Sequence, residues 1–392
     1  MAKSKTGCGC AVAALAIFLL AVAAAFLFVV RPWWKSKQLP PPSGKELQVH
    51  VLDVGEGDAI LIISPEGKSV LIDAGDTGRG KIVLDAMNRY HVTQLDYFIA
   101  THAHTDHIGG ADEVLNAVKV LNVIDNGVVP ASVEPEEWSG NKNAKPKPSG
   151  KSAGKTTELP TTKAFLEFTD AVKKNGSEFS HATPGQKYDL GGGAILTVLA
   201  PITPFFTREQ MRSGGGNEPN ANSVVVRLDY GEFSMLFAGD AETQTEERMM
   251  NKSEELIAKV LKVGHHGSKY ASSENFLKAV KPEVALISDA DANRYGHPAQ
   301  DVLDRLKAVG AKLYRTDLQG ELTITTTGKT QNGKLYEVKT GREAKGDVWA
   351  GREPQKDDSD RAGFIAYGDY GPPPKREKQE KKAKASSWNA NQ

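Results

Sequence analysis

The sequence predicts an α/β domain preceded by one membrane-spanning helix. Between residues 46 and 327, short apolar segments typical of buried strands alternate with amphipathic segments of helical spacing. One apolar segment runs directly into THAHTDHIGG at residues 101–110, a cluster of histidine and aspartate. Residues 11–30 form an uncharged apolar run of about 20 residues, the length that crosses the hydrocarbon core of a bilayer.

The composition is that of a globular protein without a strong electrostatic bias. The 392 residues are 39% hydrophobic and 25% charged, and the formal net charge is zero. No global field therefore favours a nucleic acid partner, and binding of a polyanion would depend on local patches or on metal ions. The only cysteines are Cys8 and Cys10, so the globular part has neither disulfides nor thiolate metal ligands.

Residues 1–37 predict a membrane anchor. A cleaved signal peptide and a buried core helix are the alternatives, but the apolar run is longer than a usual signal core and no obvious cleavage site follows it. Lys and Arg occur on both sides of the run, which leaves its orientation open. Proline-rich residues 38–45 predict a semi-extended linker. The run is followed by side chains typical of a membrane interface, namely Arg31, Trp33, Trp34, Lys35 and Lys37.

The first part of the domain alternates between strand and helix patterns. Residues 46–53 alternate between polar and apolar side chains, and a Pro-Glu-Gly turn separates the next two apolar segments. A later segment has apolar residues at helical spacing and is expected to pack on the resulting sheet. These patterns predict strands at 46–53, 59–64, 69–73 and 96–100, and helices at 80–90 and 111–118.

The second part begins after an insertion and ends before a tail. Residues 128–160 are rich in Lys, Gly, Ser and Pro, which predicts a mobile loop whose lysines either contact phosphates or are simply solvated. Residues 328–392 are charged and of low complexity, which predicts a largely disordered tail. Between them we expect helices at 162–174, 242–250, 274–280 and 301–309, and strands around 191–193 and at 222–229, 233–238, 257–263 and 284–288. A closing strand pair ends at 327.

The cluster at residues 101–110 predicts a metal site. Its string H-x-H-x-D-H places three imidazoles and one carboxylate within six positions, a donor set that suits zinc, manganese or iron. The first two histidines can point the same way if the backbone is extended. Gly109 and Gly110 are expected to let the backbone turn tightly beneath the ligands. The expected ligands are His102, His104, Asp106 and His107.

Other polar residues at strand ends are candidates for the same site. Asp240 comes directly after a predicted strand, in AGDAE, where a simple helix cap is a poor explanation. His265 and His266 follow another strand, in GHHGS. Asp58 and Asp73 also lie at or near strand ends, with a turn or cap carboxylate as the alternative. Outside these clusters, His50 and His91 are expected to be structural or surface histidines.

These motifs resemble those of the metallo-β-lactamase fold, of which H-x-H-x-D-H is the signature. Further phrases narrow the resemblance to the hydrolase domain of ComEC-type DNA-uptake proteins and their stand-alone relatives. They occur in the family's order and cover most of residues 46–327: LDVGEGDAILI at 52–62, VLIDAG at 70–75, NSVVVRLDYGEFSMLFAGDA at 222–241, LKVGHHGS at 261–268 and NRYGHP at 293–298.

The resemblance implies an αββα sandwich of four layers and a site for two divalent metal ions, Zn²⁺ or Mn²⁺. It implies that Asp240 bridges the two ions, which share an ionised water as nucleophile. One ion would be held by His102, His104 and Asp240, and the other by Asp106, His107, Asp240 and His265.

The resemblance also implies roles for residues around the ions. Asp106 and His297 are the catalytic candidates. His297 would bind the scissile phosphate or act as an acid, with a structural histidine as the alternative. Asp73 would support a ligand histidine and fix its tautomer. His266 would be a ligand, a substrate contact or a donor that supports a ligand. The other residues expected to support a ligand or touch substrate are Asp58, Asn222, Ser223 and Ser268.

One departure from the family pattern concerns the first ion. Many relatives place another histidine between the H-x-H-x-D-H loop and the bridging acid, and here only His181 lies in that interval, in a turn context. The ComEC-like branch usually has Asn-Ser at this point, as at Asn222 and Ser223. The first ion is therefore expected to be weakly held, or completed by water or by the amide oxygen of Asn222.

The leading functional interpretation is a metal-dependent hydrolase, a phosphodiesterase or nuclease that acts on DNA or nucleotides. The alternatives are a hydrolase of a small ester, lactone or lactam, and a membrane-tethered DNA-uptake module that binds without turnover. The resemblance implies a membrane-anchored protein with an extracytoplasmic hydrolase domain. A single span cannot form a DNA channel by itself, and no obligate protein partner is inferred.

Overall fold

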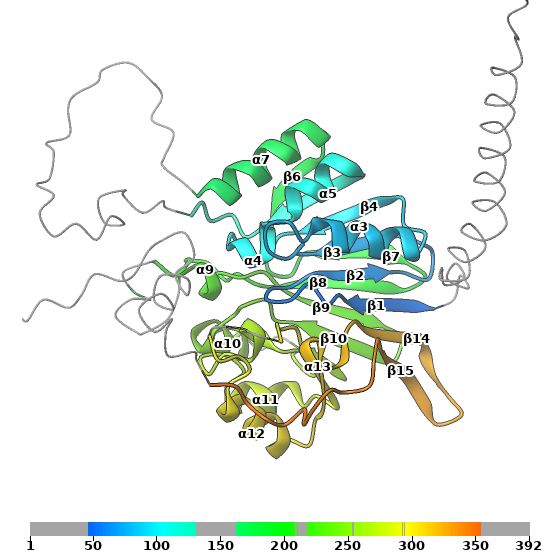
Figure 1. Ribbon diagram of the computed structural model, residues 1–392, viewed down its shortest axis with the longest axis vertical. Coiled ribbons are helices and arrows are strands. Elements are labelled where there is room, and N and C mark those ends of the chain that lie inside the picture. The colour runs from blue at the N-terminus through cyan, green and yellow to red at the C-terminus, as the bar shows by residue number, and fades with distance from the viewer. Residues whose placement is uncertain are drawn as a thin grey trace, which may run out of the picture.

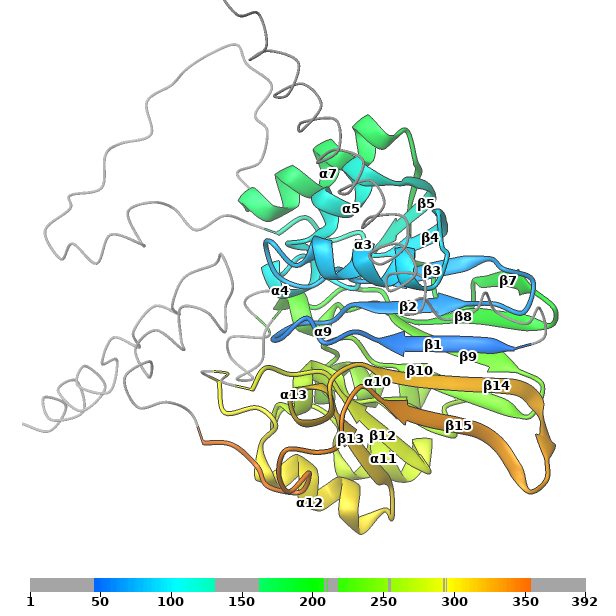
Figure 2. The same ribbon diagram turned by 45° about the vertical axis from the view of Figure 1, so that its right-hand side comes forward.

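Two β-sheets packed face to face form the centre of the fold, with helices on both outer faces (Figures 1 and 2). The chain is described here from a computed structural model. The residues that the structure describes are 46–130, 162–207, 210, 218–252, 255–291, 293 and 295–353.

The first sheet has eight strands in the order β15-β14-β1-β2-β3-β4-β5-β6. Strands β3 to β6 run parallel, and the remaining pairs are antiparallel. Their bounds are β1 Leu47–Val51, β2 Ile60–Ile63, β3 Ser69–Ile72, β4 Gln94–Ile99, β5 Lys119–Asp125, β6 Glu178–His181, β14 Leu322–Gln331 and β15 Lys334–Thr340. The helices on its outer face are α3 Gly80–Arg89, α5 Ala111–Ala117 and α7 Lys163–Asn175.

The second sheet has seven strands in the order β13-β12-β11-β10-β9-β8-β7. Strands β10 to β13 run parallel, and β7 to β10 are antiparallel. Their bounds are β7 Lys187–Gly191, β8 Ala194–Ala200, β9 Val225–Tyr230, β10 Phe233–Phe237, β11 Val260–Lys262, β12 Val284–Ile287 and β13 Lys312–Arg315. The helices on its outer face are α10 Thr243–Asn251, α11 Glu274–Val280 and α12 Gln300–Ala308.

Three apolar cores hold the four layers together. The central core lies between the sheets and includes Val49 and Ile62 from one sheet and Met235 and Phe237 from the other. Each outer core joins a sheet to its helices, because alternate strand residues point outward and meet the apolar face of a helix. The layer order of helix, sheet, sheet and helix confirms the predicted αββα sandwich.

The parallel strands of both sheets deliver polar segments to one edge of the sandwich. In the first sheet, α4 (Thr105–Ile108) follows β4 after a short loop. In the second, Asp240 follows β10, and the short 3₁₀ helix Gly264–Gly267 follows β11. Because parallel strands end at the same edge, segments far apart in the sequence meet there.

The domain continues beyond residue 327, so the prediction that it ends at this residue was wrong. Strand β14 continues to Gln331, and β15 pairs with it along its length. As an edge strand, β15 is at most half-buried, so its apolar residues form no continuous run that a sequence pattern could detect. After β15, Val348 and Trp349 still pack against the outer core of the second sheet.

Several predicted segments lie outside the described residues. They are the membrane anchor at 1–37, the linker at 38–45, all but the first three residues of the insertion at 128–160, and the tail from residue 354. Within the part of the chain that the structure describes, no helix combines the length and the apolar character needed to cross a bilayer.

Candidate metal centre

The H-x-H-x-D-H segment changes from extended to helical backbone as it passes through the site. His104 is extended, with φ −77° and ψ 150°, and α4 begins at the next residue. His102 lies in a bend before His104, and α4 itself carries Asp106 and His107. The chain turns at Gly109 and Gly110, as predicted, although the φ of −63° at Gly109 is one that any residue can adopt. Glycine is needed there because a Cβ would lie 2.4 Å from the Thr105 carbonyl oxygen.

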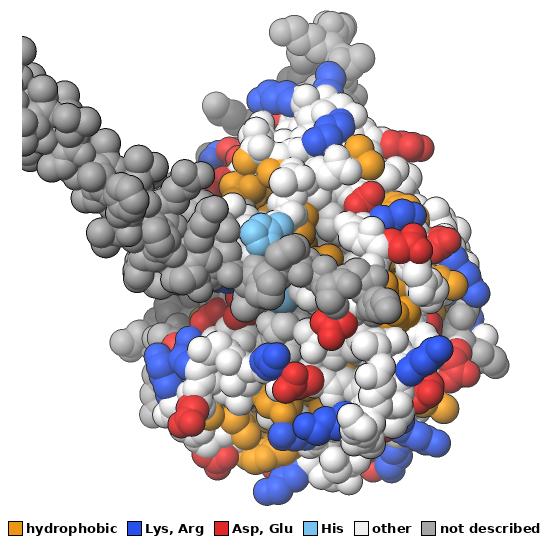
Figure 3. Space-filling model, turned by 90° about the vertical axis from the view of Figure 1, so that its right-hand side faces the viewer, with side chains coloured by type: hydrophobic (Ala, Val, Ile, Leu, Met, Phe, Trp, Pro, Cys, Tyr) orange, Lys and Arg blue, Asp and Glu red, His pale blue; other side chains and the backbone are white. Residues whose placement is uncertain are grey.

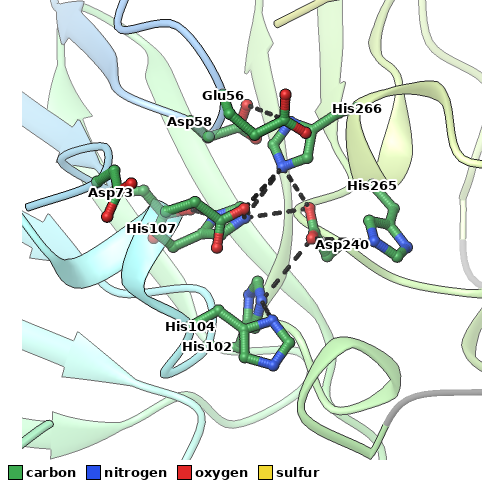
Figure 4. Close-up of polar contacts among 12 residues, drawn as sticks. Glu56, Asp58, Asp73, His102, His104, His107, Asp240, His265 and His266 are labelled. Atoms are coloured by element: carbon green, nitrogen blue, oxygen red, sulfur yellow. Dashed lines mark hydrogen bonds and ion pairs between the residues drawn. The ribbon is translucent and has the colours of Figure 1, made fainter. Parts of the chain in front are cut away.

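Asp240 lies at the centre of the site, between two groups of histidines (Figure 4). Its Oδ1 lies 3.3 Å from His107 Nε2 and 3.5 Å from His266 Nε2. Its Oδ2 lies 3.8 Å from His102 Nε2 and 3.8 Å from His265 Nε2. The carboxylate therefore presents one oxygen to each group.

The donors form two tight groups that share Asp240. Within each group, one ligand atom of every residue lies within 4.8 Å of those of the others. His102 Nε2 and His104 Nδ1 are 3.0 Å apart, so both nitrogens face the same small volume. The first group consists of His102, His104 and Asp240, and the second of Asp106, His107, Asp240 and His266.

The second group contains His266 where the sequence analysis expected His265. His266 Nε2 lies 3.5 Å from Asp106 Oδ2 and 3.3 Å from His107 Nε2. Its Nδ1 donates a hydrogen bond to the Ser288 carbonyl oxygen at 3.0 Å, which fixes the ring and leaves Nε2 facing the group. His265 lies on the other side of Asp240, outside the tight groups.

Asp73 orients His107 from below the site. Its Oδ2 lies 2.8 Å from His107 Nδ1 and also accepts a hydrogen bond from the Thr101 hydroxyl at 2.7 Å. Its Oδ1 accepts from the Thr101 backbone N–H at 2.8 Å. Since Nδ1 of His107 donates to Asp73, the neutral form of the ring carries its lone pair on Nε2, toward Asp240, which is the tautomer that a metal ligand needs.

Asp58 lies behind the second group, where its carboxylate is within 4.8 Å of ligand atoms of Asp73 and His107. Its carboxylate lies 2.8 Å from the ammonium of Lys262, and both side chains are almost completely buried. Asp58 Oδ1 is also 3.7 Å from His266 Nδ1. The pair joins the loop before β2 to strand β11, so it links the two sheets beside the site.

Three other candidates have clear positions. Asn222 exchanges two hydrogen bonds of 2.9 Å with the backbone of Phe206, so its amide oxygen accepts the Phe206 N–H. A role of this oxygen at the first ion stays a prediction. Ser223 Oγ accepts from the Asp240 backbone N–H at 3.2 Å and lies 3.3 Å from His102 Nδ1. Ser268 lies in the wall of the cleft that opens onto the site.

That cleft has a volume of about 490 Å³ and reaches the donor groups at His104, Asp106 and Asp240. His297 lies on its wall, with Nδ1 3.5 Å from Glu56 Oε1. Sequence reasoning missed Glu56. The available signal was its place between two glycines in GEGDA, where Gly57 has a φ of 107° and a Cβ would lie 1.9 Å from the Asp106 carbonyl oxygen.

The site concentrates opposite charges in a buried volume. Burial lowers the pKa of His102 well below its usual value, and the nearby His107 lowers it further. His107 behaves in the opposite way: against burial, the carboxylates of Asp240 and Asp106 hold its pKa well above the usual range. Burial is likewise outweighed at His266, where Asp240 and Asp106 raise the pKa to about 9.

The donor set fits divalent metal ions. Asp240 Oδ1 is buried and accepts no hydrogen bond from a described residue, although two histidine nitrogens lie within 3.5 Å. Imidazole and carboxylate ligands suit zinc, manganese and iron. Protons balance the charge of these groups in the metal-free protein, and a cation would replace them.

The remaining histidines lie away from the donor groups. His181 ends strand β6 rather than standing in a turn, and its Nδ1 pairs with Asp125 at 2.5 Å. Its side chain is 63% exposed, so it does not complete the first group. His50 is buried against Tyr90 and Glu321, a structural position.

Comparison with known proteins identifies relatives over about three quarters of the chain. ComE operon protein 3 of Bacillus subtilis (strain 168) is 29% identical over 314 residues, which are 76% of this chain and 35% of that protein. Competence protein ComA of Neisseria gonorrhoeae is 27% identical over 279 residues, 71% of this chain and 32% of that protein. Recombination protein 2 of Haemophilus influenzae is 28% identical over 297 residues, 74% of this chain and 29% of that protein.

The chain therefore spans about a third of the length of these curated relatives. The sequence profile of the Metallo-beta-lactamase superfamily matches residues 52–288. This match runs from the loop before β2 to the end of β12 and includes every donor described above. With two sheets between two helix layers and this match over more than half of its length, the chain belongs to the metallo-β-lactamase superfamily.

Proposed function

We propose that this protein is a metal-dependent hydrolase that cleaves phosphodiester bonds in DNA or nucleotides. The observation that carries the proposal is the position of Asp240, whose two carboxylate oxygens face two different groups of histidines. A carboxylate shared in this way suits a pair of ions, and paired ions are common in phosphatases and nucleases.

The two donor groups would hold the ions. In this assignment His266 takes the place that the sequence analysis gave to His265. Two such cations, when bound, lower the pKa of water and stabilise negative charge on a phosphoryl oxygen. The first ion would be held by His102, His104 and Asp240, and the second by Asp106, His107, Asp240 and His266.

The cleft supports a phosphate-bearing substrate. Lys269 lies on its wall, and its ammonium forms no ion pair with a described residue, so the positive charge is available to a phosphate. The neighbouring Tyr270 is 49% exposed, and such aromatic rings stack on nucleobases. On the face that Figure 3 shows, by contrast, acidic and basic side chains are intermingled.

His297 and Asp106 are placed to act on the substrate. Both line the cleft, and Glu56 lies 3.5 Å from Nδ1 of His297, where it would orient the ring. His297 would donate a proton to the leaving oxygen or bind a phosphate oxygen. Asp106, which lies 3.5 Å from His266, would combine metal binding with positioning of the attacking water.

The relatives support a connection with DNA, since two of them are named as competence or recombination proteins. Because the chain spans about a third of their length, their activity as whole proteins is carried over only as part of this proposal. We further propose that residues 11–30 anchor the chain in a membrane, with the hydrolase domain on the extracytoplasmic side. The support is the uncharged run followed by a belt of tryptophan and basic residues.

Hydrolysis by the full chain, purified in detergent and loaded with Mn²⁺ or Zn²⁺, tests the proposal. Single- and double-stranded DNA and bis-p-nitrophenyl phosphate would be compared with nitrocefin and a simple lactone. We expect cleavage of the phosphodiesters, and loss of that cleavage in His104→Ala and in Asp240→Ala. Turnover of nitrocefin or lactone alone, or DNA binding without cleavage, would contradict the proposal. Unchanged DNA cleavage in both variants would identify a contaminating nuclease.

A further inference from the structure

We propose that the adjacent residues His265 and His266 bind different metal ions, one on each side of Asp240. The inference rests on the two-ion centre of the proposed function and gives the first ion a fourth protein ligand. The first position then consists of His102, His104, His265 and Asp240, and the second of Asp106, His107, His266 and Asp240.

The contacts of Asp240 divide evenly between the two positions (Figure 4). Oδ1 faces His107 Nε2 at 3.3 Å and His266 Nε2 at 3.5 Å. Oδ2 faces His102 Nε2 at 3.8 Å and His265 Nε2 at 3.8 Å. Each oxygen therefore meets one histidine from the H-x-H-x-D-H segment and one from the turn after β11.

The backbone of that turn directs the two rings apart. His265 has φ 45° and ψ 49°, and His266 has φ 52° and ψ 22°, so two consecutive residues with side chains adopt the left-handed conformation. Each such residue costs on the order of 1–2 kcal/mol, a strain that is found mainly at functional sites. The two ring planes are 77° apart and their centroids 6.2 Å apart, which sends one ring to each side of Asp240.

The His266 ring is supported as metal-binding histidines usually are, and a carboxylate lies near the second nitrogen of His265. A ligand histidine normally gives its second ring nitrogen to a carboxylate or a carbonyl oxygen. His266 Nδ1 has the Ser288 carbonyl oxygen at 3.0 Å, and His107 Nδ1 has the Asp73 carboxylate at 2.8 Å. His265 Nδ1 lies 3.6 Å from the buried Glu242 carboxylate, too far for a hydrogen bond, and the Asn220 amide nitrogen lies 3.2 Å from both ring nitrogens. A turn of the ring toward His102 would have to bring Nδ1 within hydrogen-bond distance of Glu242.

The other described candidates for a fourth ligand at the first position have different partners. His181 pairs with Asp125, and the Asn222 amide exchanges hydrogen bonds with the Phe206 backbone. His265 lies outside the tight group of donors, so ion binding requires its ring to turn toward His102. The ring borders the open cleft and is 17% exposed, which leaves space for that movement.

Metal counting on the full chain, independent of catalysis, tests the assignment. The chain would be purified in detergent, freed of metal, and titrated with Mn²⁺ by calorimetry, and the bound ions would be followed by electron paramagnetic resonance. We expect about two ions per wild-type chain with an exchange-coupled signal, and about one ion with an uncoupled six-line signal in His265→Ala. His181→Ala, a histidine replacement outside the donor groups, is the matched control and keeps the coupled pair.

A second variant keeps the test valid if His265→Ala fails to fold, which circular dichroism would reveal. Glu242→Gln retains the ligand but removes the carboxylate behind it, so we expect the affinity for one of the two ions to fall about 10- to 100-fold. Two coupled ions in His265→Ala, unchanged affinities in Glu242→Gln, or a single ion in the wild type would overturn the assignment. If the wild type binds two ions but cleaves no phosphodiester, the proposed function fails and the assignment of His265 stands.

Discussion

Two buried clusters in this protein combine histidine with carboxylate, and they differ in how the protein satisfies them. In the cluster around Glu321, the carboxylate accepts hydrogen bonds from Arg89 and from the Tyr90 hydroxyl. His50 Nδ1 lies 3.1 Å from the Thr323 hydroxyl and 3.3 Å from the Glu321 carboxylate, Nε2 lies 3.3 Å from the Gln48 side-chain oxygen, and the ring stacks on Tyr90. Both oxygens of the Glu321 carboxylate and both ring nitrogens of His50 have polar partners within the protein, although Nε of Arg89 has none among the described residues.

The cluster around Asp240 is built differently. Imidazole nitrogens face one another at 3.0 and 3.3 Å, and a buried carboxylate oxygen lacks a hydrogen bond from the described residues. Buried polar groups without partners cost free energy, so such a cluster persists when a ligand satisfies it. The comparison teaches that histidine and aspartate in proximity do not by themselves make a metal site. The distinguishing feature is the set of imidazole nitrogens and carboxylate oxygens that the protein directs at one small shared volume.

Among the variants that distinguish the two clusters, Asp240→Asn is expected to have the largest effect on metal content and activity. The amide cannot bridge two cations, so metal should be lost and phosphodiester cleavage should fall by more than the ~10- to 100-fold typical of residues behind the ligands. Metal content by plasma emission and cleavage of bis-p-nitrophenyl phosphate would measure both changes. Full metal content in this variant would remove Asp240 from the centre.

A smaller effect is expected from Asp73→Asn, which leaves all direct donors in place. The amide can donate to His107 Nδ1 and so favours the wrong tautomer, which would lower the affinity for one ion by about 10- to 100-fold. Calorimetric titration with Zn²⁺ would measure this affinity, with Asp96→Asn, on the same sheet but away from the donors, as the control. Equal affinities in the two variants would show that Asp73 has only a structural role.

The Glu321 cluster should respond in stability rather than in metal binding. In Glu321→Gln the hydrogen bonds of Arg89 and Tyr90 to a charged acceptor are lost, which we expect to lower the free energy of unfolding by about 1–3 kcal/mol. Denaturant titration of the metal-free protein would measure the loss. A change in metal content in this variant would mean that the two clusters are coupled.

The pH dependence of the free energy of unfolding tests the role of the Glu321 cluster further. Against burial, hydrogen bonds from His50 and Tyr90 hold the pKa of Glu321 below its ordinary value of 4.5. A lowered pKa contributes stability that is present above pH 4.5 and is lost as the pH falls through the folded-state pKa. The stability difference between wild type and Glu321→Gln should therefore shrink below pH 4.5, as urea titrations at several pH values would show. A difference that grows toward low pH would contradict this sign.

The smallest effect is expected from His181→Ala. His181 pairs with Asp125, but it is largely exposed, and exposed pairs contribute about 0.2–1 kcal/mol. Thermal melting should shift by no more than a few degrees, and the metal content should not change. Loss of an ion in this variant would restore His181 as the missing ligand of the family pattern.

The sequence alone predicted the parts of the site and of the fold that depend on local patterns. The H-x-H-x-D-H string is local, and the strands that bring Asp240 to it are apolar and buried, so both were visible. Which of His265 and His266 faces the second donor group could not be predicted from the sequence, because it depends on two consecutive residues in the left-handed conformation. The direction of the Asn222 amide depends on the Phe206 backbone, sixteen residues away.

Edge and loop features were equally hard to predict, for a different reason. Strand β15 is half-exposed and rich in lysine, so its pattern matches that of a solvated tail. Glu56 lies in a turn whose shape is set by two glycines and by the close approach of the α4 segment. In both cases tertiary contacts, rather than local preference, determine the structure.

The ion pair between Asp58 and Lys262 constrains how this chain can change over evolutionary time. Both side chains are almost fully buried, so replacing either one leaves the other charge unpaired in the interior and destabilises the fold. Replacing both together can leave the free energy of unfolding nearly unchanged. The two positions therefore have to be exchanged as a unit. Descendants of this chain should therefore carry either both charges or neither. Where both are kept, the pair continues to hold the two sheets in the same relative position beside the donor groups.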